Sequence, residues 1–325
     1  MNPKEIRIVF MGTPDFAVES LKALVENGYR VVGVITSPDK PAGRGRQLSE
    51  SAVKKYAIQQ NLKILQPEKL KNTEFIAELE SLKADLQIVV AFRMLPEIVW
   101  NMPLMGTFNL HGSLLPQYRG AAPLNWAVIN GETETGVTTF LLSHEIDTGR
   151  IMFQEKIGIA ENDTVGDLHD RLMVIGANLV LKTVDALANG NIEAIDQEHL
   201  IDHTDHIKHA PKIFKDDCRI DWTRDTESVR NLIRGLSPYP TAWTELEHPD
   251  KGEVLMAKIF VVSRDNSSLP AAPGTIQTDG KKFLKIACPD GWLTVTDIQL
   301  SGKKRMKIDE LLRGFQDLGE WKIKM

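Results

Sequence analysis

The chain has 325 residues, which suits two domains of ordinary size, and its hydrophobic fraction of 42% and charged fraction of 26% are ordinary for a globular protein. A net charge of −5 excludes a surface that is basic throughout, so a nucleic-acid partner would need local basic patches. The two cysteines, Cys218 and Cys288, exclude a disulfide framework, and no Cys/His cluster has zinc spacing, so we expect a reducing cytoplasmic setting and no metal.

The first 36 residues alternate between strand and helix patterns. Apolar runs at 6–11 and 31–36 predict buried strands, and the apolar spacing of 16–25 predicts a helix between them. This order predicts a parallel, Rossmann-like sheet. The turn after the first strand carries Gly12 alone and then a proline, not G-x-G-x-x-G, which argues against a dinucleotide enzyme. The first run is too short for a signal peptide, and no apolar run approaches a membrane span, so we expect no membrane partner.

The segment from Pro38 to Leu48 has no apolar period. It contains three cationic residues, two glycines and two prolines. Two interpretations stay open from these residues alone: a solvated surface loop, or a mobile basic loop that orders when it meets a phosphate or a base edge.

Helix and strand patterns then resume. The spacing predicts helices over 51–61 and 72–83, a short strand over 62–65 and a central strand over 85–92. These elements extend the predicted parallel sheet.

An apolar-polar alternation, Phe108-Asn109-Leu110-His111, predicts a further strand. Phe108 and Leu110 should face a core, while Asn109 and His111 share the other face. Glycine and proline then break the strand into a loop. Open α/β sheets place their chemistry at strand ends that open into loops.

The residue types at this strand end suit acyl chemistry. The Asn109 amide is a fixed donor for an oxyanion, and an imidazole can move protons, although a lone histidine is more often structural. A carboxylate that could orient the His111 ring is Asp147, in the run Ile146-Asp147-Thr148-Gly149 after another apolar stretch.

The rest of the chain divides into a helical end of the first domain and a strand-rich second domain. The sequence predicts a helix over 124–129, strands over 135–142 and 151–155, a long helix over 164–189, and a polar linker. A short helix over 229–236 and short, evenly spaced strands follow, which predict a small barrel; these strands are expected at 241–246, 254–262, 274–278, 284–287 and 292–299. The densest basic run, 302–307, is a solvated face or a phosphate-binding patch.

One stretch identifies a family. The run from His111 to Pro123, followed by Gly136-Val137-Thr138 and by 146–149, resembles the formyltransferases that use 10-formyltetrahydrofolate. Over its whole length the chain most resembles the methionyl-tRNA formyltransferases. In that family the catalytic residues are the Asn, the His of the HxSLLP run and the Asp of D-T-G, which correspond here to Asn109, His111 and Asp147. The resemblance implies an α/β fold, with a Rossmann-like parallel sheet in the N-terminal domain and a smaller C-terminal OB-like β-barrel.

The resemblance also implies a site for the folate donor. The end of the strand at 85–92 is expected to contact the pterin, and Phe92-Arg93 stands where the family usually has an aromatic–glycine pair; arginine lacks the conformational freedom of glycine. The loop 143–147 is expected to cover the pterin. The residues expected to contact the donor are Phe92, Leu95, Ser113, Leu114, Leu115, Pro116, Leu142 and Ile146.

The same resemblance implies a tRNA surface. A loop matching 38–53 is inserted into the first domain of this family and contacts the tRNA acceptor end, and the Arg of its P-A-G-R-G string corresponds to Arg44. The residues expected to contact initiator methionyl-tRNA are Lys40, Arg44, Arg46, Lys208, Lys212, Lys303, Lys304 and Arg305. The expected division of the chain is a catalytic domain at 1–190, a linker at 191–208 and a tRNA-binding domain at 209–325, in a monomer.

The predicted activity is therefore transfer of the formyl group of 10-formyltetrahydrofolate to the α-amine of initiator methionyl-tRNA, in support of translation initiation. No metal and no covalent nucleophile is needed. Three alternatives stay open. They are a formyltransferase for a small amine, such as a sugar nucleotide or glycinamide ribonucleotide, a non-catalytic RNA-binding protein, and a nicotinamide dehydrogenase.

Overall fold

The computed structural model describes residues 1–42, 47–201, 206–265, 271–315 and 317–325, with only the backbone described at 41, 42 and 47. The chain packs as two compact units that interleave along the sequence. Unit 1 comprises Met1–Pro123, Glu134–Ile157 and His169–His209, and unit 2 comprises Leu124–Thr133, Gly158–Leu168 and Ala210–Met325. Two segments of the predicted catalytic domain, 124–133 and 158–168, therefore pack with the C-terminal part of the chain.

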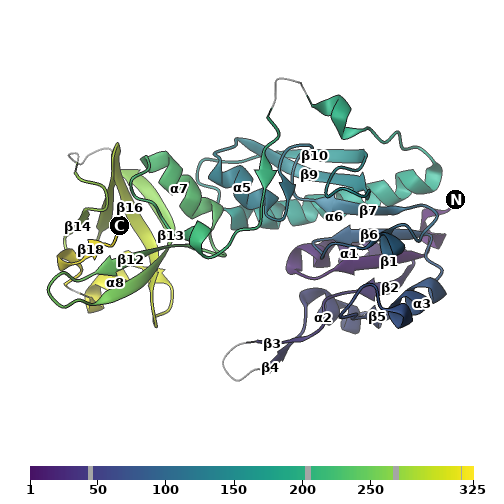
Figure 1. Ribbon diagram of the computed structural model, residues 1–325, viewed down its shortest axis with the longest axis horizontal. Coiled ribbons are helices and arrows are strands. Elements are labelled where there is room, and N and C mark those ends of the chain that lie inside the picture. The colour runs from purple at the N-terminus through teal and green to yellow at the C-terminus, as the bar shows by residue number, and fades with distance from the viewer. Residues whose placement is uncertain (43–46, 202–205, 266–270, 316) are drawn as a thin grey trace. The chain divides into compact units, whose positions relative to one another are not determined.

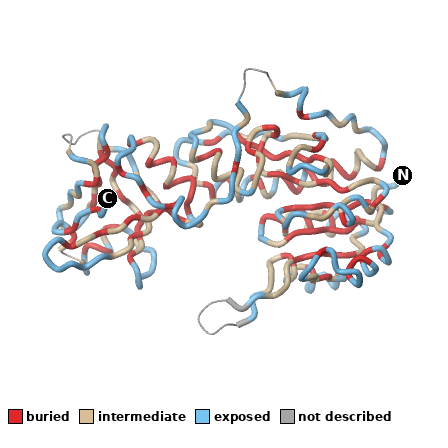
Figure 2. Tube along the Cα trace, in the orientation of Figure 1, coloured by how far each residue is buried: buried red, intermediate tan, exposed pale blue. Residues whose placement is uncertain are grey.

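The described part of unit 1 is built on a seven-stranded sheet whose order is β10-β9-β7-β6-β1-β2-β5 (Figure 1). The five strands from β5 to β7 are parallel, and β9 runs antiparallel to β7. The strands are β1 (Ile8–Gly12), β2 (Val31–Ile35), β5 (Ile64–Leu65), β6 (Leu86–Val90), β7 (Thr107–His111), β9 (Glu134–Leu141) and β10 (Ile151–Gly158). Every residue of β1 and β6 is buried, as expected of central parallel strands (Figure 2). The predicted Rossmann-like sheet is confirmed.

Helices follow the strands at the expected places. They are α1 (Asp15–Glu26), α2 (Ala52–Gln59), α3 (Thr73–Ser81), α4 (Glu97–Trp100) and α6 (Val165–Asn189), with 3-10 turns η1 (Pro3–Glu5) and η2 (Gln197–Leu200). Local capping fixes two of the starts, because the Ser51 hydroxyl accepts the Lys54 amide hydrogen at α2, and the Asn72 side chain accepts the Glu74 amide hydrogen at α3.

The longest helix, α6, is the one helix of the described chain that by length and composition alone could cross a membrane. Such a pattern also marks the core helix of a globular domain, and 44% of its most apolar window is buried. Gly176 of α6 lies so close to Leu110 of β7 that an added Cβ would come within 2.7 Å of the leucine side chain. The apolar face of α6 therefore packs on the sheet of unit 1.

The predicted basic loop contains a short hairpin, which corrects the expectation of an aperiodic loop. Strands β3 (Lys40–Ala42) and β4 (Gln47–Ser49) pair antiparallel and project from the sheet of unit 1 (Figure 1). Three residues a strand are too few to show a period of two in the sequence. The hairpin is held at its base by Asp39, whose carboxylate accepts hydrogen bonds from Lys54 and Gln66. These two bonds lower the pKa of the Asp39 carboxyl.

Unit 2 is built on an antiparallel sheet ordered β14-β15-β16-β13-β12-β18, with β17 paired to β16. Its strands are β12 (Ala242–Glu247), β13 (Val254–Asp265), β14 (Ile276–Thr278), β15 (Leu284–Cys288), β16 (Gly291–Leu300), β17 (Met306–Lys307) and β18 (Lys322–Ile323). A register shift near Val261 bends β13 against β16, as the curling of a barrel requires. The predicted OB-like barrel is confirmed.

The remaining described elements of the chain are helices and short strands. They are α5 (Pro123–Ile129), α7 (Thr226–Gly235), α8 (Ile308–Gly314), η3 (Asp216–Cys218), η4 (Leu318–Glu320), β8 (Arg119–Gly120) and β11 (His209–Ala210). The barrel closes over an apolar core that includes Trp222, Ile259 and Leu293. Trp222 is 1% exposed, and its indole N–H donates to the Thr244 hydroxyl over 3.1 Å.

Candidate active site

His111 ends β7 as a buried imidazole with a fixed orientation. Its Nε2 lies 2.9 Å from the carbonyl oxygen of Tyr118. Because a carbonyl only accepts, Nε2 carries the ring hydrogen and Nδ1 is the nitrogen with a free electron pair in the neutral ring. That Nδ1 lies 3.8 Å from Oδ2 of Asp147. This separation is longer than a direct hydrogen bond. If Nδ1 takes up a proton, the charged ring and the Asp147 carboxylate form an ion pair.

Asp147 is held at both its carboxylate and its backbone. The Gly120 amide donates to Oδ2 over 2.9 Å, and the Gln197 side chain donates to the Asp147 carbonyl over 2.9 Å. The residue has φ +55°, in the left-handed region that aspartate tolerates better than most residues. These bonds fix the carboxylate beside the ring of His111.

The loop after β7 is closed by buried hydroxyl and amide groups. The Ser113 hydroxyl donates to the Gln117 carbonyl over 2.7 Å, and Thr138 of β9 donates to the Ser113 carbonyl over 2.6 Å. Gln154 of β10 donates to the Leu115 carbonyl over 2.8 Å. Ser113 and Thr138 are fully buried, so both hold the loop from within.

Asn109 lies two residues before His111 and is half-buried. Its neighbours Phe108 and Leu110 are buried in the core, as predicted, and His111 is buried as well. Within the described chain, the Asn109 side chain makes no hydrogen bond, so its amide is available to a substrate oxygen.

The side chains expected to line the donor site gather in two adjoining apolar clusters. Phe92, Leu95 and Leu142 pack partly buried around Val89 and Val99 in one cluster. Leu142 also packs against the second cluster, which contains Leu115, Phe140 and Ile151. Pro116 is buried, Leu114 is half-buried against the position of Gly136, and Ile146 is 61% exposed.

Arg93 does not need the backbone freedom of a glycine. The left-handed residue at this strand end is Ala91, with φ +47°, and Arg93 is not among the described residues of positive φ. The Arg93 guanidinium donates to the carbonyls of Glu68, over 2.8 Å, and of Pro67. Arginine is therefore accommodated here as a brace to the segment after β5.

The loop expected to cover the donor rests on α4. His144 stacks edge-on against Trp100, with ring centroids 5.4 Å apart, and its Nε2 lies 3.7 Å from Glu97. Inside the loop, the hydroxyl of Thr148 donates to the Glu145 carbonyl over 3.1 Å. The loop is thus ordered immediately before Asp147.

Comparison with known proteins identifies the family to which this chain belongs. The family model "Formyl transferase" matches residues 6–184, and "Formyl transferase, C-terminal domain" matches 212–316. The chain belongs to the formyl transferase family. It is 59% identical over 324 residues to the methionyl-tRNA formyltransferase of Bacteroides fragilis, covering 100% of this chain and 99% of that protein. It is 51% identical over 320 residues to the methionyl-tRNA formyltransferase of Flavobacterium johnsoniae, covering 98% and 99%.

Solved structures share the fold of this formyl transferase. The sugar 3N-formyl transferase WlaRD, crystallised in the presence of dTDP and 5-N-formyl-THF, matches 92% of this chain and 99% of its own, with a TM-score of 0.62 and 21% identity. HypX from Aquifex aeolicus in complex with tetrahydrofolic acid matches 95% of this chain at a TM-score of 0.63 and 19% identity. The chain spans 47% of HypX.

The cationic residues predicted to meet tRNA differ in how they are held. Lys40, Lys303 and Lys304 are exposed. Arg305 is tied down, since its guanidinium lies 3.4 Å from Asp297 and 4.3 Å from the ring centre of Phe260.

Two further lysines, Lys208 at the end of the linker and Lys212 just after it, lie over aromatic rings. The Lys208 ammonium lies 6.0 Å from the Tyr118 ring centre, and the Lys212 ammonium lies 5.3 Å from the Phe214 ring centre. Arg44 and Arg46 lie outside the described residues.

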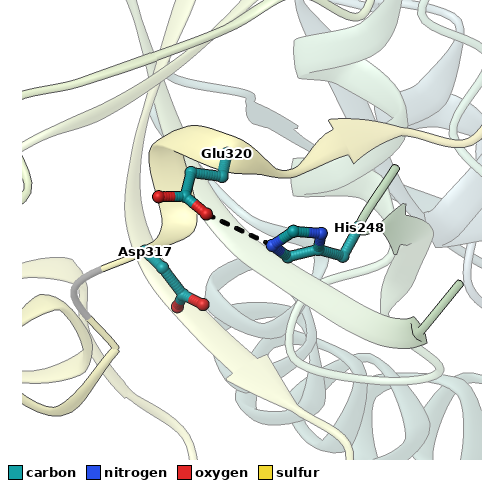
Figure 3. Close-up of side chains that lie close together, drawn as sticks. All are labelled: His248, Asp317 and Glu320. Carbon is teal, nitrogen blue, oxygen red and sulfur yellow. Dashed lines mark hydrogen bonds and ion pairs between the residues drawn. The ribbon is translucent and has the colours of Figure 1, made fainter. Parts of the chain in front are cut away.

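One group of metal-ligand type exists in the described chain, in unit 2: His248, Asp317 and Glu320 (Figure 3). Nε2 of His248 lies 3.3 Å from Glu320, and Nδ1 accepts the Asp250 amide hydrogen over 3.3 Å, so the neutral ring carries its hydrogen on Nε2. Lys251 pairs with Asp317 over 3.0 Å. Nε2 of His248, which faces the two carboxylates, carries a hydrogen, and Asp317 is already paired with Lys251. We therefore interpret the group as a set of polar contacts rather than a metal centre.

Two residues that contact the site had no predicted role. Arg119 and Gln197 bond to each other beside Asp147, with distances of 3.0 and 2.7 Å from the guanidinium to Oε1 of Gln197. Burial lowers the pKa of Arg119, and the charges of Asp147, Glu145 and Glu198 oppose that shift. Gln197 stands in a polar stretch with no motif around it, so no local signal could have selected it.

Proposed function

We propose that this chain transfers the formyl group of 10-formyltetrahydrofolate to the α-amine of initiator methionyl-tRNA and so supports translation initiation. The observation that carries the proposal is that His111 lies beside Asp147, two residues from the Asn109 amide, which has no hydrogen-bond partner among the described residues. The full-length relatives at 59% and 51% identity, which are named methionyl-tRNA formyltransferases, support this acceptor.

The reaction moves an acyl group between two nitrogens. A bond forms from the amine nitrogen to the formyl carbon, and the bond from that carbon to the donor nitrogen breaks. One proton leaves the amine and one reaches the departing nitrogen. The attacking amine must be neutral, and a free α-amine has a pKa near 8, so a base that accepts its proton aids the reaction at neutral pH.

His111 suits the proton transfer because its tautomer is fixed. With Nε2–H donated to Tyr118, the electron pair on Nδ1 takes the proton, and the Asp147 carboxylate stabilises the resulting imidazolium. Asn109 would donate an amide hydrogen to the formyl oxygen as negative charge develops there. One such donor is typically worth about 3–4 kcal/mol of transition-state stabilisation.

The donor would lie against the apolar side chains at the ends of β6 and β9. Phe92, Leu95 and Leu142 offer partly exposed apolar surface for a flat pterin, and Ile146 offers a further apolar side chain in the loop after β9. We also propose Ser113, Leu114, Leu115 and Pro116 as the loop that borders this surface.

The acceptor would be held by local basic surfaces rather than by net charge, which is −5. In unit 1 these are Lys40, with Arg44 and Arg46 beside it in the sequence, and Lys208. In unit 2 they are Lys212, Lys303, Lys304 and Arg305.

We infer a cytoplasmic monomer without a metal as the working form. Both cysteines are free and buried, as a reducing compartment allows. Burial raises the pKa of the Cys288 thiol to about 12, which keeps it protonated and unreactive.

The deciding experiment is formyl transfer from 10-formyltetrahydrofolate to purified charged tRNAs. We expect rapid formylation of initiator methionyl-tRNA and little formylation of elongator methionyl-tRNA. Equal rates on both would overturn the selectivity. No transfer to either, with slow hydrolysis of the donor, would overturn the tRNA acceptor and favour a small amine in its place.

A further inference from the structure

Gln197 is a buried polar side chain in the segment predicted to be only a linker. It begins η2, and it is 2% exposed. Burying an amide is costly unless its donors and acceptor are all satisfied. Here they are satisfied, and each partner belongs to a segment that carries the candidate active site.

The amide nitrogen of Gln197 holds the backbone around Asp147. Nε2 donates to the Asp147 carbonyl over 2.9 Å and to the Gly149 carbonyl over 2.8 Å. Gly149 packs closely against β9, because an added Cβ would come within 1.6 Å of the Leu141 carbonyl oxygen, so only glycine fits there. Both hydrogens of the amide are thereby spent on fixing the turn in which Asp147 adopts φ +55°.

The amide oxygen of Gln197 holds the strand that positions the other half of the site. Oε1 accepts from Nε and Nη2 of Arg119 over 3.0 and 2.7 Å. The residues on either side of Arg119 serve the two site residues directly, since the Tyr118 carbonyl accepts from His111 and the Gly120 amide donates to Asp147. Hydrogen bonds therefore link His111 to residue 118 and residue 120 to Asp147, and Gln197 ties residue 119 to the backbone of Asp147.

We propose that Gln197 is a positioning residue that sets the separation of the Asp147 carboxylate from the His111 ring. The proposal rests on the proposed function for its kinetic test. Its structural test needs no substrate, because it concerns two groups of the chain itself.

Three substitutions separate the two sides of the Gln197 amide. Gln197→Met keeps the length and removes both the donors and the acceptor. Gln197→Glu keeps an acceptor for Arg119 and removes the donors to Asp147 and Gly149. His199→Ala, in the same turn at an exposed side chain, is the matched control.

The kinetic test compares kcat and KM for formyl transfer. For Gln197→Met and Gln197→Glu we expect kcat to fall by about 10- to 100-fold, the size expected when reacting groups lose their alignment, with KM within about twofold. His199→Ala should match the wild type. A near-normal kcat for Gln197→Glu with a defective Gln197→Met would assign the amide to holding Arg119 alone and overturn the proposal.

The structural test follows the ring of His111 by NMR, with its signal assigned by its loss in His111→Asn. Nδ1 of His111 lies 3.8 Å from the Asp147 carboxylate, so Asp147→Asn should change the 15N chemical shifts of the ring. Gln197→Met should move the same signals in the same direction, because the carboxylate would no longer be held beside the ring. Unchanged ring signals in a folded Gln197→Met would overturn the proposal. A wild type that fails to formylate methionyl-tRNA would overturn the proposed function, and these ring signals would still test the role of Gln197 independently.

Discussion

The candidate active site is held by buried hydrogen-bonding groups, whereas the barrel of unit 2 is centred on a large apolar cluster. Around the site, His111, Ser113, Thr138 and Gln197 are all less than a tenth exposed, and each makes a hydrogen bond to another segment. The barrel core is a large apolar cluster around residues such as Trp222. Hydrogen bonds have fixed directions whereas apolar contacts do not, so the site specifies geometry and the barrel supplies stability. Substitutions in the two regions should therefore affect different measurements.

The largest effect should come from the two charged partners of the site. We expect His111→Ala and Asp147→Ala to lower turnover by about 100- to 10,000-fold, because each removes the proton acceptor or the group that stabilises it. Stability should fall only modestly, by about 1–3 kcal/mol for the hydrogen-bond partners left unpaired, and tRNA binding should change little. Turnover close to that of the wild type in either variant would remove the assignment of these residues.

The barrel core should respond in stability instead. Trp222→Ala deletes a side chain that is 1% exposed and leaves the Thr244 hydroxyl without its donor. Such a change typically costs about 3–5 kcal/mol of unfolding free energy, to be measured by urea denaturation. The matched comparison is Thr138→Val beside the site. Expressed as free energies, its loss in turnover should exceed its loss in unfolding free energy. The opposite ranking would break the contrast between the regions.

The surface of the barrel should show the smallest effect, limited to binding. Lys303→Ala with Lys304→Ala removes two exposed cations, so tRNA binding should weaken by roughly several-fold at low salt. The slope of the logarithm of the binding constant against the logarithm of the salt concentration should become shallower by about one to two. Lys281→Ala with Lys282→Ala is the control, because it removes the same charge from another exposed turn of unit 2. Equal weakening in both pairs would mean that only total charge matters.

The sequence predicted the parts of the fold that repeat along the chain. The alternation at 108–111 and the apolar run of β6 contain enough residues to show their period, and the strands of the barrel follow the same rule. The hairpin at Lys40–Ala42 and the helix α8 were missed, since three-residue strands and a helix that follows a basic run show no clear pattern.

The site was predictable only where a motif carried it. The strings around His111 and Asp147 selected these two residues, and the structure brings them to 3.8 Å. Gln197 could not be selected, because its importance comes from contacts with residues 48 to 78 positions away in the chain. Long-range hydrogen bonds of a single side chain leave no trace in local composition.

The segment after α6 also has a consequence for how small an active fragment of this chain can be. Beyond Gln197, the backbone at Lys208 accepts from the Tyr118 amide over 2.6 Å and donates to the Gln117 side chain over 2.8 Å. A fragment that stops at residue 190 would contain Asn109, His111 and Asp147 but would lack these braces. A fragment that keeps these braces therefore extends at least to residue 209, the last residue of unit 1, and shortening or grafting this enzyme should respect that lower limit.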